Sequence, residues 1–341
     1  MLREALRKAA SGESLTEGEA ERALETIMEG TVPPAATSAL LTALRVRGES
    51  VSEIVGFARA MRRFAARVEA PEGVVDTCGT GGDAKGTINV STAAAFVARG
   101  AGVTIAKHGN RAATSQAGSA DVLEALGAEI ELGPEQVGEC IRESGIGFMF
   151  ARTHHPAMRF VAPVRAELPF RTVFNLLGPL TNPAGAGRQV VGVFGGAYVR
   201  PVAEALQGLG AEKALVVHGA DGMDEITVTH KTFVAEVGGG EIEEYEISPE
   251  DIGLASHPPD GLLGGDAHLN ARILRDVLSG EEKGAARDVI LLNAGAAVYV
   301  SGRAKNIEEG VRLAHESIGS GEAIRVLEDF VRATRRVAGM A

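Results

Sequence analysis

Apolar residues in the first part of the chain recur at the spacing of an α-helix. Leu40 and Leu44, for example, lie four positions apart and would share one helix face. Two capping boxes, in which a threonine or serine precedes a glutamate by three positions, begin at Thr16 and Ser50 and mark helix starts. This pattern predicts a small all-helical domain over residues 1–70.

Beyond residue 70 the pattern alternates between short apolar runs and helical segments. The apolar runs are typical of buried parallel strands, and they are VVDT, VTIA, GFMFA, RQVVGVFG and KALVVHG. Segments with helical spacing, such as STAAAFVARG and PEQVGECIRESG, separate them. The alternation predicts an α/β domain over residues 71–341, with a mostly parallel central sheet flanked by helices.

Some segments depart from this alternation. The stretch at about residues 153–185 mixes proline and helical patterns. We expect it to pack beside the N-terminal helices, complete their domain, and act as a hinge or lid over the site. KTFVAEV and EIEEYEI flank three glycines and predict an antiparallel hairpin. ILLNAGAAVYV fits either a buried helix or a strand, and its alanines favour the helix.

Residues that could bind an anion follow the end of the first predicted strand. After VVDT comes CGTGGD, whose glycines remove side chains where backbone N–H groups could approach an anion. Asn89, Ser91 and Thr92 then open an apolar helix, and a helix N terminus favours phosphate. A glycine cluster after a strand often only reverses the chain, so this loop alone leaves both interpretations open.

The next predicted strand, VTIA, leads into a second polar loop. The basic, amide and hydroxyl residues of this loop are Lys107, His108, Asn110, Arg111, Thr114, Ser115 and Ser119. We expect Ser119 to cap the following helix. Two anion-binding loops at the ends of parallel strands predict a site for a ligand with more than one phosphate group. The spacing matches neither the dinucleotide fingerprint nor the P-loop.

An acidic pair, Asp224 and Glu225, follows the predicted strand KALVVHG through a glycine turn. Such a pair is usually a solvated turn. The carboxyl ends of parallel strands, however, meet at the edge of the sheet where ligands gather. Carboxylates bind Mg²⁺ through oxygen and commonly share it with substrate phosphates, and Ser91 could add a hydroxyl ligand.

A candidate partner for a substrate carboxylate, Arg165, lies in the segment PVRAELPFR. Guanidinium binds a carboxylate through two parallel hydrogen bonds. Arg159 and Arg171 lie nearby, and spacing alone does not choose among the three arginines.

The composition narrows the class of partner. The net charge is −11 and the pI is about 5.3, which argues against binding to duplex nucleic acid or to an anionic membrane. Two cysteines are too few for a disulfide framework and favour a reducing, cytoplasmic location. The sequence shows no long uncharged apolar segment and no signal-peptide pattern. These features favour a cytoplasmic enzyme with small-molecule substrates.

The chain resembles the anthranilate phosphoribosyltransferase family, which serves tryptophan biosynthesis. The motifs that carry the resemblance are, in order, DTCGTGGD, TINVSTAAAF, KHGNRA, GSADVLEALG, HHPAMRFVAPVRAELPFRTVFNLLGPLTNP and HGADGMDE. The resemblance implies transfer of the phosphoribosyl group of 5-phosphoribosyl 1-pyrophosphate (PRPP) to the amine of anthranilate. It also implies Mg²⁺ as cofactor and a homodimer formed through the helical domain.

The resemblance further implies roles for individual residues. PRPP would contact Gly79, Gly82, Asp83, Thr87, Asn89, Val90, Ser91, Thr92, Lys107, His108, Gly109, Asn110, Arg111, Ala112, Ala113, Thr114, Ser115 and Ser119. Mg²⁺ would be bound by Ser91, Asp224 and Glu225. Anthranilate would be held by Gly79, Asn110 and Arg165. The loop around Ala113 has fewer serines than in many members of the family. Which of its side chains donate hydrogen bonds to phosphate therefore stays open.

Lys107 and His108 are the residues expected to serve the chemistry. Charge builds on the departing pyrophosphate, so Lys107 and backbone donors should matter most. His108 is expected only to position the substrates, because an aromatic amine is already a neutral nucleophile. Two other functions stay open at this point: a pyrimidine nucleoside phosphorylase of the same fold, and a non-catalytic phosphate or nucleic-acid binder on this scaffold.

Overall fold

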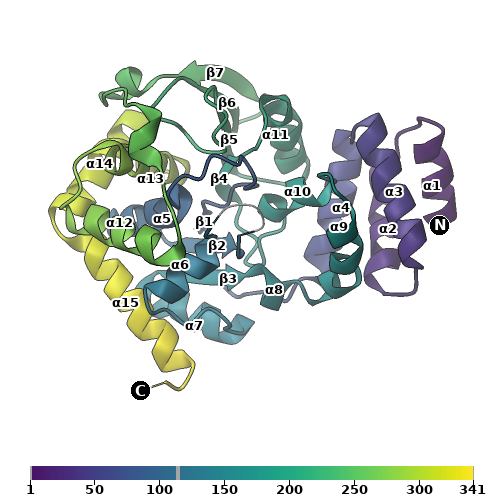
Figure 1. The fold of residues 1–341 in the computed structure, drawn as a ribbon, viewed down its shortest axis with the longest axis horizontal. Coiled ribbons are helices and arrows are strands. Elements are labelled where there is room, and N and C mark those ends of the chain that lie inside the picture. The colour runs from purple at the N-terminus through teal and green to yellow at the C-terminus, as the bar shows by residue number, and fades with distance from the viewer. Residues whose placement is uncertain (1, 113–115, 341) are drawn as a thin grey trace.

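The computed structural model describes residues 2–112 and 116–340, which form a small lobe and a larger one (Figure 1). The small lobe contains the N-terminal helices α1 (Leu2–Ala10), α2 (Glu17–Met28), α3 (Pro34–Arg47) and α4 (Val51–Phe64). Both predicted capping boxes are present, since the backbone N–H groups of Glu19 and Glu53 donate to the hydroxyls of Thr16 and Ser50 (3.4 Å each). The predicted helical character of this region is confirmed.

The described residues of the larger lobe form one seven-stranded sheet. In spatial order its strands are β3 (Ile146–Phe150), β2 (Ile105–Gly109), β1 (Val75–Asp76), β4 (Arg188–Gly192), β5 (Lys213–Gly219), β6 (Thr232–Val237) and β7 (Glu243–Ile247). The strands from β3 to β5 pair in parallel, and β6 and β7 pair antiparallel. The predicted mostly parallel sheet and the predicted hairpin are therefore confirmed. The strand order reverses at β1, and ligands bind at the carboxyl ends of strands beside such a reversal.

Alternate residues of β5 face different cores. Leu215 and Val217 belong to the core of the C-terminal helices, whereas Ala214 and Val216 belong to the core that includes the small lobe. The helices of the first core are α5 (Val90–Gly100), α6 (Ser119–Ala125), α12 (Ala267–Ser279), α13 (Ala285–Val300), α14 (Ile307–Gly319) and α15 (Glu322–Val337). On the other face lies α11 (Val199–Gly208), and α7 (Pro134–Ser144) packs on β3. The segment ILLNAGAAVYV lies within α13, so the helix prediction is confirmed.

The inserted segment packs beside the N-terminal helices, as expected. It contains α8 (Ala151–His154), α9 (Ala162–Glu167) and α10 (Phe174–Leu177), with a 3₁₀ helix at Pro156–Phe160. Its apolar residues Val161 and Leu177 join the core of the small lobe. Arg62 of α4 also donates through Nε to the carbonyl of Leu180 (2.7 Å). No helix among the described residues is long and apolar enough to span a bilayer.

Two predicted boundaries are wrong. The strand VTIA was expected to end before Lys107, but β2 continues to Gly109 because it pairs with β3 as far as Phe150. Lys107 and His108 are therefore buried strand residues. Ser119 was expected to cap α6, but Gly118 occupies that position, and the backbone N–H of Gly118 donates to the Asp121 carboxylate (2.8 Å). The carboxylate at the third helical position thus satisfies the N–H of the cap residue, and no hydroxyl caps this helix.

Candidate active site

The glycine-rich loop between β1 and α5 packs against the end of β4 and the Asp224 turn. The backbone N–H of Thr80 donates to the carbonyl of Gly192 (2.8 Å), and that of Phe194 donates to Thr80 Oγ1 (3.0 Å). A Cβ atom on Gly79 would lie 3.2 Å from Asp224 Oδ2, so the backbone here approaches the acidic turn closely. The loop is thereby fixed where the strand order reverses.

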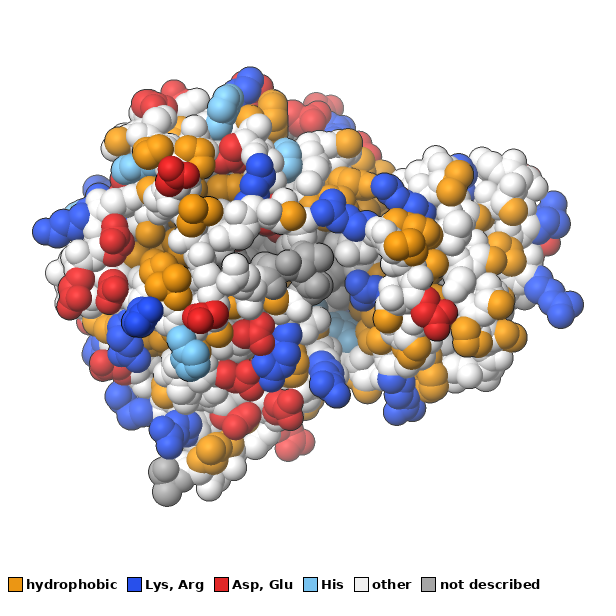
Figure 2. Space-filling model, in the orientation of Figure 1, with side chains coloured by type: hydrophobic (Ala, Val, Ile, Leu, Met, Phe, Trp, Pro, Cys, Tyr) orange, Lys and Arg blue, Asp and Glu red, His pale blue; other side chains and the backbone are white. Residues whose placement is uncertain are grey.

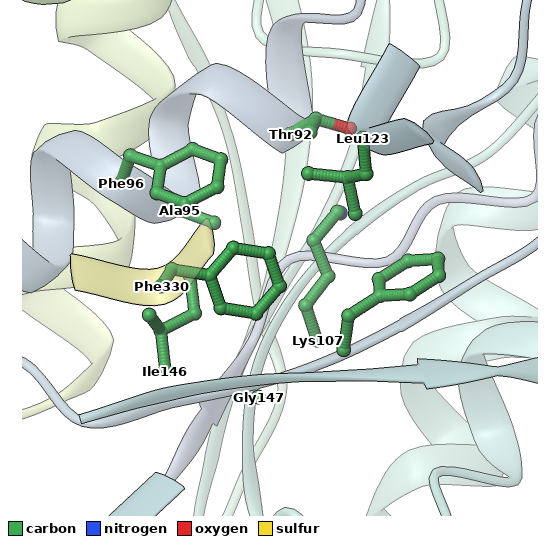
Figure 3. A pocket seen from close by; sticks show the side chains of 9 residues that line it. Thr92, Ala95, Phe96, Lys107, Leu123, Ile146, Gly147 and Phe330 are labelled. Carbon is green, nitrogen blue, oxygen red and sulfur yellow. The ribbon is translucent and has the colours of Figure 1, made fainter. Parts of the chain in front are cut away.

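Lys107 links the loop to the acidic turn. Only 3% of its surface is exposed, and it shares a small cavity with Leu123 and Phe330 (Figure 3). Its ammonium group donates to the carbonyl and hydroxyl of Thr77 (3.3 and 3.2 Å) and to Ser91 Oγ (3.3 Å).

Ser91 connects this ammonium group to the acidic pair. Its backbone N–H donates to Glu225 Oε1 (3.3 Å). Lys107 lies on β2 and Glu225 lies in the turn after β5, 118 positions later in the sequence. Both nevertheless contact Ser91 at the start of α5. They therefore lie on the same rim of the sheet, at the carboxyl ends of its parallel strands.

Carboxylates of Asp83, Asp224 and Glu225 gather on this rim. Asp224 is buried, and its backbone N–H donates to Asp83 Oδ2 (3.4 Å). Burial, reinforced by the Asp83 carboxylate, raises the pKa of Asp224, and burial together with Asp224 raises the pKa of Glu225. A cation placed beside these groups would lower both pKa values and favour the ionised carboxylates.

The donor set fits a magnesium ion that is shared with a substrate. Among the described residues, no three His, Cys, Asp or Glu side chains form a metal-binding group by themselves. Asp224, Glu225 and the Ser91 hydroxyl instead offer a partial set of oxygen ligands. Mg²⁺ prefers oxygen and usually takes its remaining ligands from water and phosphate.

The loop after β2 is tied to its own helix. Arg111 donates through Nη1 to Asp121 Oδ1 and through Nη2 to Glu124 Oε1 (2.8 Å each), and Ser119 Oγ donates to the carbonyl of Asn110 (3.2 Å). A phosphate at Arg111 must therefore compete with two carboxylates. Ala112 also donates its backbone N–H to Asp121 (3.1 Å). The predicted contacts Ala113, Thr114 and Ser115 lie outside the described residues.

The remaining predicted PRPP contacts lie around the start of α5. Thr87 forms an antiparallel bridge with Leu263. Asn89 occupies the N-cap position, but its side chain does not cap the helix. Val90 and Thr92 are buried in the first turn. These residues adjoin the rim, while Gly82 and Asp83 flank it from the glycine-rich loop.

The structure separates the three candidate arginines of the inserted segment. Arg171 donates to the carbonyl of Gly82 and lies over the ring of Phe194. Arg159 is exposed. Arg165 is half-buried over the ring of Phe174 and has no ion pair with any described residue. Burial lowers the pKa of Arg165, and a bound carboxylate would offset that cost.

A group of buried histidines lies beside Lys107, and the sequence interpretation assigned only one of them, His108, to the site. The rings of His108 and His155 are 5.0 Å apart, and His108 Nδ1 lies 3.1 Å from the carbonyl of Gly178. Burial lowers the pKa of His108 to about 3, that of His155 to about 4, and that of His154 as well. The imidazoles are therefore neutral. The HHP sequence directly after a predicted strand was the available signal.

A buried carboxylate beneath the rim, Asp76, was also missed. Its oxygens accept from the backbone N–H of His108 (3.1 Å) and from Asn182 Nδ2 (2.7 Å). Asn182 donates as well to the carbonyl of Ala106 (2.9 Å). Asp76 thus joins the ends of β1 and β2 to the returning end of the inserted segment.

Comparison with known proteins agrees with this arrangement. The α/β domain of a glycosyl transferase family matches residues 71–324, and the helical bundle domain of that family matches residues 3–65. The anthranilate phosphoribosyltransferase of Rubrobacter xylanophilus is 83% identical over 99% of both chains. The crystal structure of the Thermus thermophilus enzyme aligns with a TM-score of 0.93 at 52% identity, covering 97% of this chain and 99% of that one.

A more distant structure carries ligands. The anthranilate phosphoribosyltransferase of Saccharomyces cerevisiae, in complex with PRPP and Mg, aligns with a TM-score of 0.89 at 31% identity, covering 99% of this chain and 98% of that one. The fold, the rim and the full-length similarity lead to one conclusion: the chain belongs to the anthranilate phosphoribosyltransferase family.

Proposed function

We propose that the rim around Lys107, Ser91 and Glu225 is where this enzyme transfers the phosphoribosyl group of PRPP to anthranilate. The products are N-(5-phosphoribosyl)anthranilate and pyrophosphate, and the reaction serves tryptophan biosynthesis. The observation that carries the proposal is that Lys107 and Glu225 both contact Ser91 at the start of α5. In this proposal a cation, a helix N terminus and an acidic pair would surround one ligand.

The reaction needs stabilisation of the leaving group more than a base. The amine nitrogen forms a bond to C1 of the ribose while the bond from C1 to the pyrophosphate oxygen breaks, through a transition state with oxocarbenium character. Lys107 and the backbone N–H groups of the glycine-rich loop stabilise the charge that develops on the pyrophosphate. After attack the positively charged nitrogen gives its extra proton to the released pyrophosphate or to water.

Ser91, Asp224 and Glu225 would hold Mg²⁺, as the yeast complex with PRPP and Mg supports. When bound, the ion neutralises charge on the phosphate oxygens. Asp224 and Glu225 would remain ionised beside it, whereas burial alone favours their protonated forms.

The acceptor lies on the opposite side of Lys107 in this proposal. Arg165 would pair with the anthranilate carboxylate, with Asn110 beside it, and Gly79, which borders Asp224, would lie between the two substrates. The neutral rings of His108 and His155 leave the aromatic amine unprotonated and keep water away from the reacting centre. His108 positions substrates and does not act as a base.

The direct test is the loss of anthranilate fluorescence when PRPP and Mg²⁺ are added. A second arm with thymidine and phosphate tests the alternative of a nucleoside phosphorylase. A non-catalytic nucleic-acid binder is the third possibility. On the face shown in Figure 2, acidic and basic side chains are interspersed and form no basic band, and filter binding with single-stranded DNA tests that possibility.

We also propose the domain boundaries and assembly of the enzyme. The helical domain would comprise residues 1–70 with about 153–185, and the inserted segment would act as the hinge or lid. A homodimer would form through α1 and α3, where Val46 is 82% exposed beside a hollow lined by Ala9, Ala39 and Ala43. Light scattering after size exclusion, with Val46→Glu as the disrupting variant, tests the dimer. The free thiols of Cys78 and Cys140 support a cytoplasmic location.

A further inference from the structure

A segment near the C-terminal helices lies against the predicted PRPP loop. We call residues Leu262–Gly265 the strap. The backbone N–H of Ile88 donates to the carbonyl of Leu262 (3.0 Å), and that of Gly264 donates to the carbonyl of Gly86 (2.8 Å). A Cβ atom on Gly264 would lie 2.9 Å from the carbonyl carbon of Thr87. The strap therefore touches the loop backbone directly and leaves no room for a side chain at residue 264.

One buried amide fixes both the strap and the loop. Asn270 lies in the first turn of α12 and is 3% exposed. Its Oδ1 accepts from the backbone N–H of Gly265 (2.8 Å), and its Nδ2 donates to Asn89 Oδ1 (2.9 Å). Asn89 Nδ2 in turn donates to the carbonyl of Ala117 (3.1 Å). A continuous series of amide hydrogen bonds thus runs from α12 to both predicted phosphate loops.

This series explains why Asn89 does not cap α5. Its side-chain oxygen is taken by Asn270, and its amide nitrogen holds the loop that follows β2. The amide at position 270 offers an acceptor to Gly265 through its oxygen and a donor to Asn89 through its nitrogen at the same time. A carboxylate would keep the first bond and place two oxygens against each other in the second.

We propose that Asn270 is a positioning residue for phosphoribosyl transfer, acting through Asn89 and the strap to hold the two phosphate loops in register. The proposal rests on the function proposed above. Asn270 acts only through these partners, so its loss should weaken binding of the phosphoribosyl donor most, whereas anthranilate keeps its proposed charged partner Arg165, which lies on α9 outside both loops.

The test is steady-state kinetics of Asn270→Asp. We expect the KM for PRPP to rise about tenfold, because a buried hydrogen-bonding group loses its partner. The KM for anthranilate should stay within a factor of about two, since Arg165 lies on α9 and has no hydrogen bond in the series from Asn270. In an Asn89→Ala background the same substitution should add little, because the two residues act through one bond.

Ser317→Ala is the matched control. Ser317 is buried and donates to the carbonyl of Val97 (2.9 Å), on the same helix α5 but in its later turns. This variant loses one buried hydrogen bond to α5 and should keep both KM values. The melting temperatures of the two variants show whether they are comparably folded.

A backbone variant tests the strap separately. Gly264→Ala would push against Thr87 and Asn270, and it should also raise the KM for PRPP selectively. Gly319→Ala, with no atom within 4 Å of the added methyl group, is its control. If Asn270→Asp does not fold, Gly264→Ala decides the proposal alone.

The proposal is overturned if the KM for PRPP stays at the wild-type value, if both KM values rise equally, or if the effect is fully additive with Asn89→Ala. Wild-type protein that consumes no anthranilate would instead overturn the proposed function, so the two failures are distinguishable.

Discussion

The two sides of Lys107 are built from opposite kinds of chemistry. On one side, which we call the metal side, Asp83, Asp224 and Glu225 gather carboxylates at the end of the sheet. On the other, which we propose as the acceptor side, lie the buried neutral rings of His108, His154 and His155, and the proposed carboxylate partner Arg165 is half-buried over the ring of Phe174.

This difference explains how one rim of the sheet can bind two substrates of different charge. Burial raises the pKa values of Asp224 and Glu225, so the metal side is incomplete without added positive charge. Burial lowers the pKa values of the histidines, so the imidazoles of the acceptor side stay neutral without any added charge. We expect the metal side to govern the leaving group and the acceptor side to govern the nucleophile.

Lys107 stands between the two sides, and its removal should have the largest effect. Lys107→Met should lower kcat about 100- to 1,000-fold, as the loss of a preorganised donor to a developing anion does. Lys213→Met, a half-buried lysine over the ring of Tyr299, is the control. Circular dichroism should show both variants folded. Near-normal turnover by Lys107→Met would show that Lys107 does not stabilise the leaving pyrophosphate.

The metal side is tested by the magnesium requirement. Glu225→Gln should raise the Mg²⁺ concentration for half-maximal rate about 10- to 100-fold, because a charged oxygen ligand is lost. Glu236→Gln, whose carboxylate accepts from Tyr245 and Tyr299 away from the rim, should leave that concentration unchanged. An identical Mg²⁺ requirement in both variants would place the metal elsewhere.

The acceptor side is tested by Arg165. Arg165→Ala should raise the KM for anthranilate about tenfold, since a charge-assisted pair is lost, with a smaller change for PRPP. Arg159→Ala removes an exposed arginine of the same segment and should change neither value. Equal increases for both substrates in Arg165→Ala would contradict its role.

The smallest effect concerns acid stability. His155 binds a proton only near pH 4 when folded but near pH 6.5 when unfolded, so the folded state holds fewer protons between these values and loses stability as pH falls. Replacing it with phenylalanine should reduce the loss between pH 7 and pH 5 by about 2 kcal/mol. Urea unfolding at both pH values measures this, with exposed His315→Ala as control. An unchanged difference would mean that His155 titrates normally.

Local patterns were enough to predict the fold class. The capping boxes at Thr16 and Ser50, the helix α13 and the β6–β7 hairpin each follow from residues close together in the chain. The end of β2 did not, because Gly109 is held in the strand by its pairing with Phe150. Propensity and spacing do not report such long-range pairing.

For the same reason, only part of the site could be predicted from the sequence. Motifs indicated Lys107, Ser91 and Glu225, and the structure brings them together. The contact between Asn89 and Asn270 joins residues 181 positions apart, and no motif marks Asn270. Asp76 and the paired histidines contribute to the site because they are buried. Their burial depends on the inserted segment folding back over the sheet.

The most direct test of the two-sided rim is a crystal structure with PRPP and Mg²⁺. We predict a metal ion about 2.0–2.1 Å from oxygens of the Asp224–Glu225 pair and of the pyrophosphate group, with C1 of the ribose facing the side of His108 and Arg165. Pyrophosphate bound among the histidines, or a metal ion with no ligand from Ser91, Asp224 or Glu225, would contradict the account.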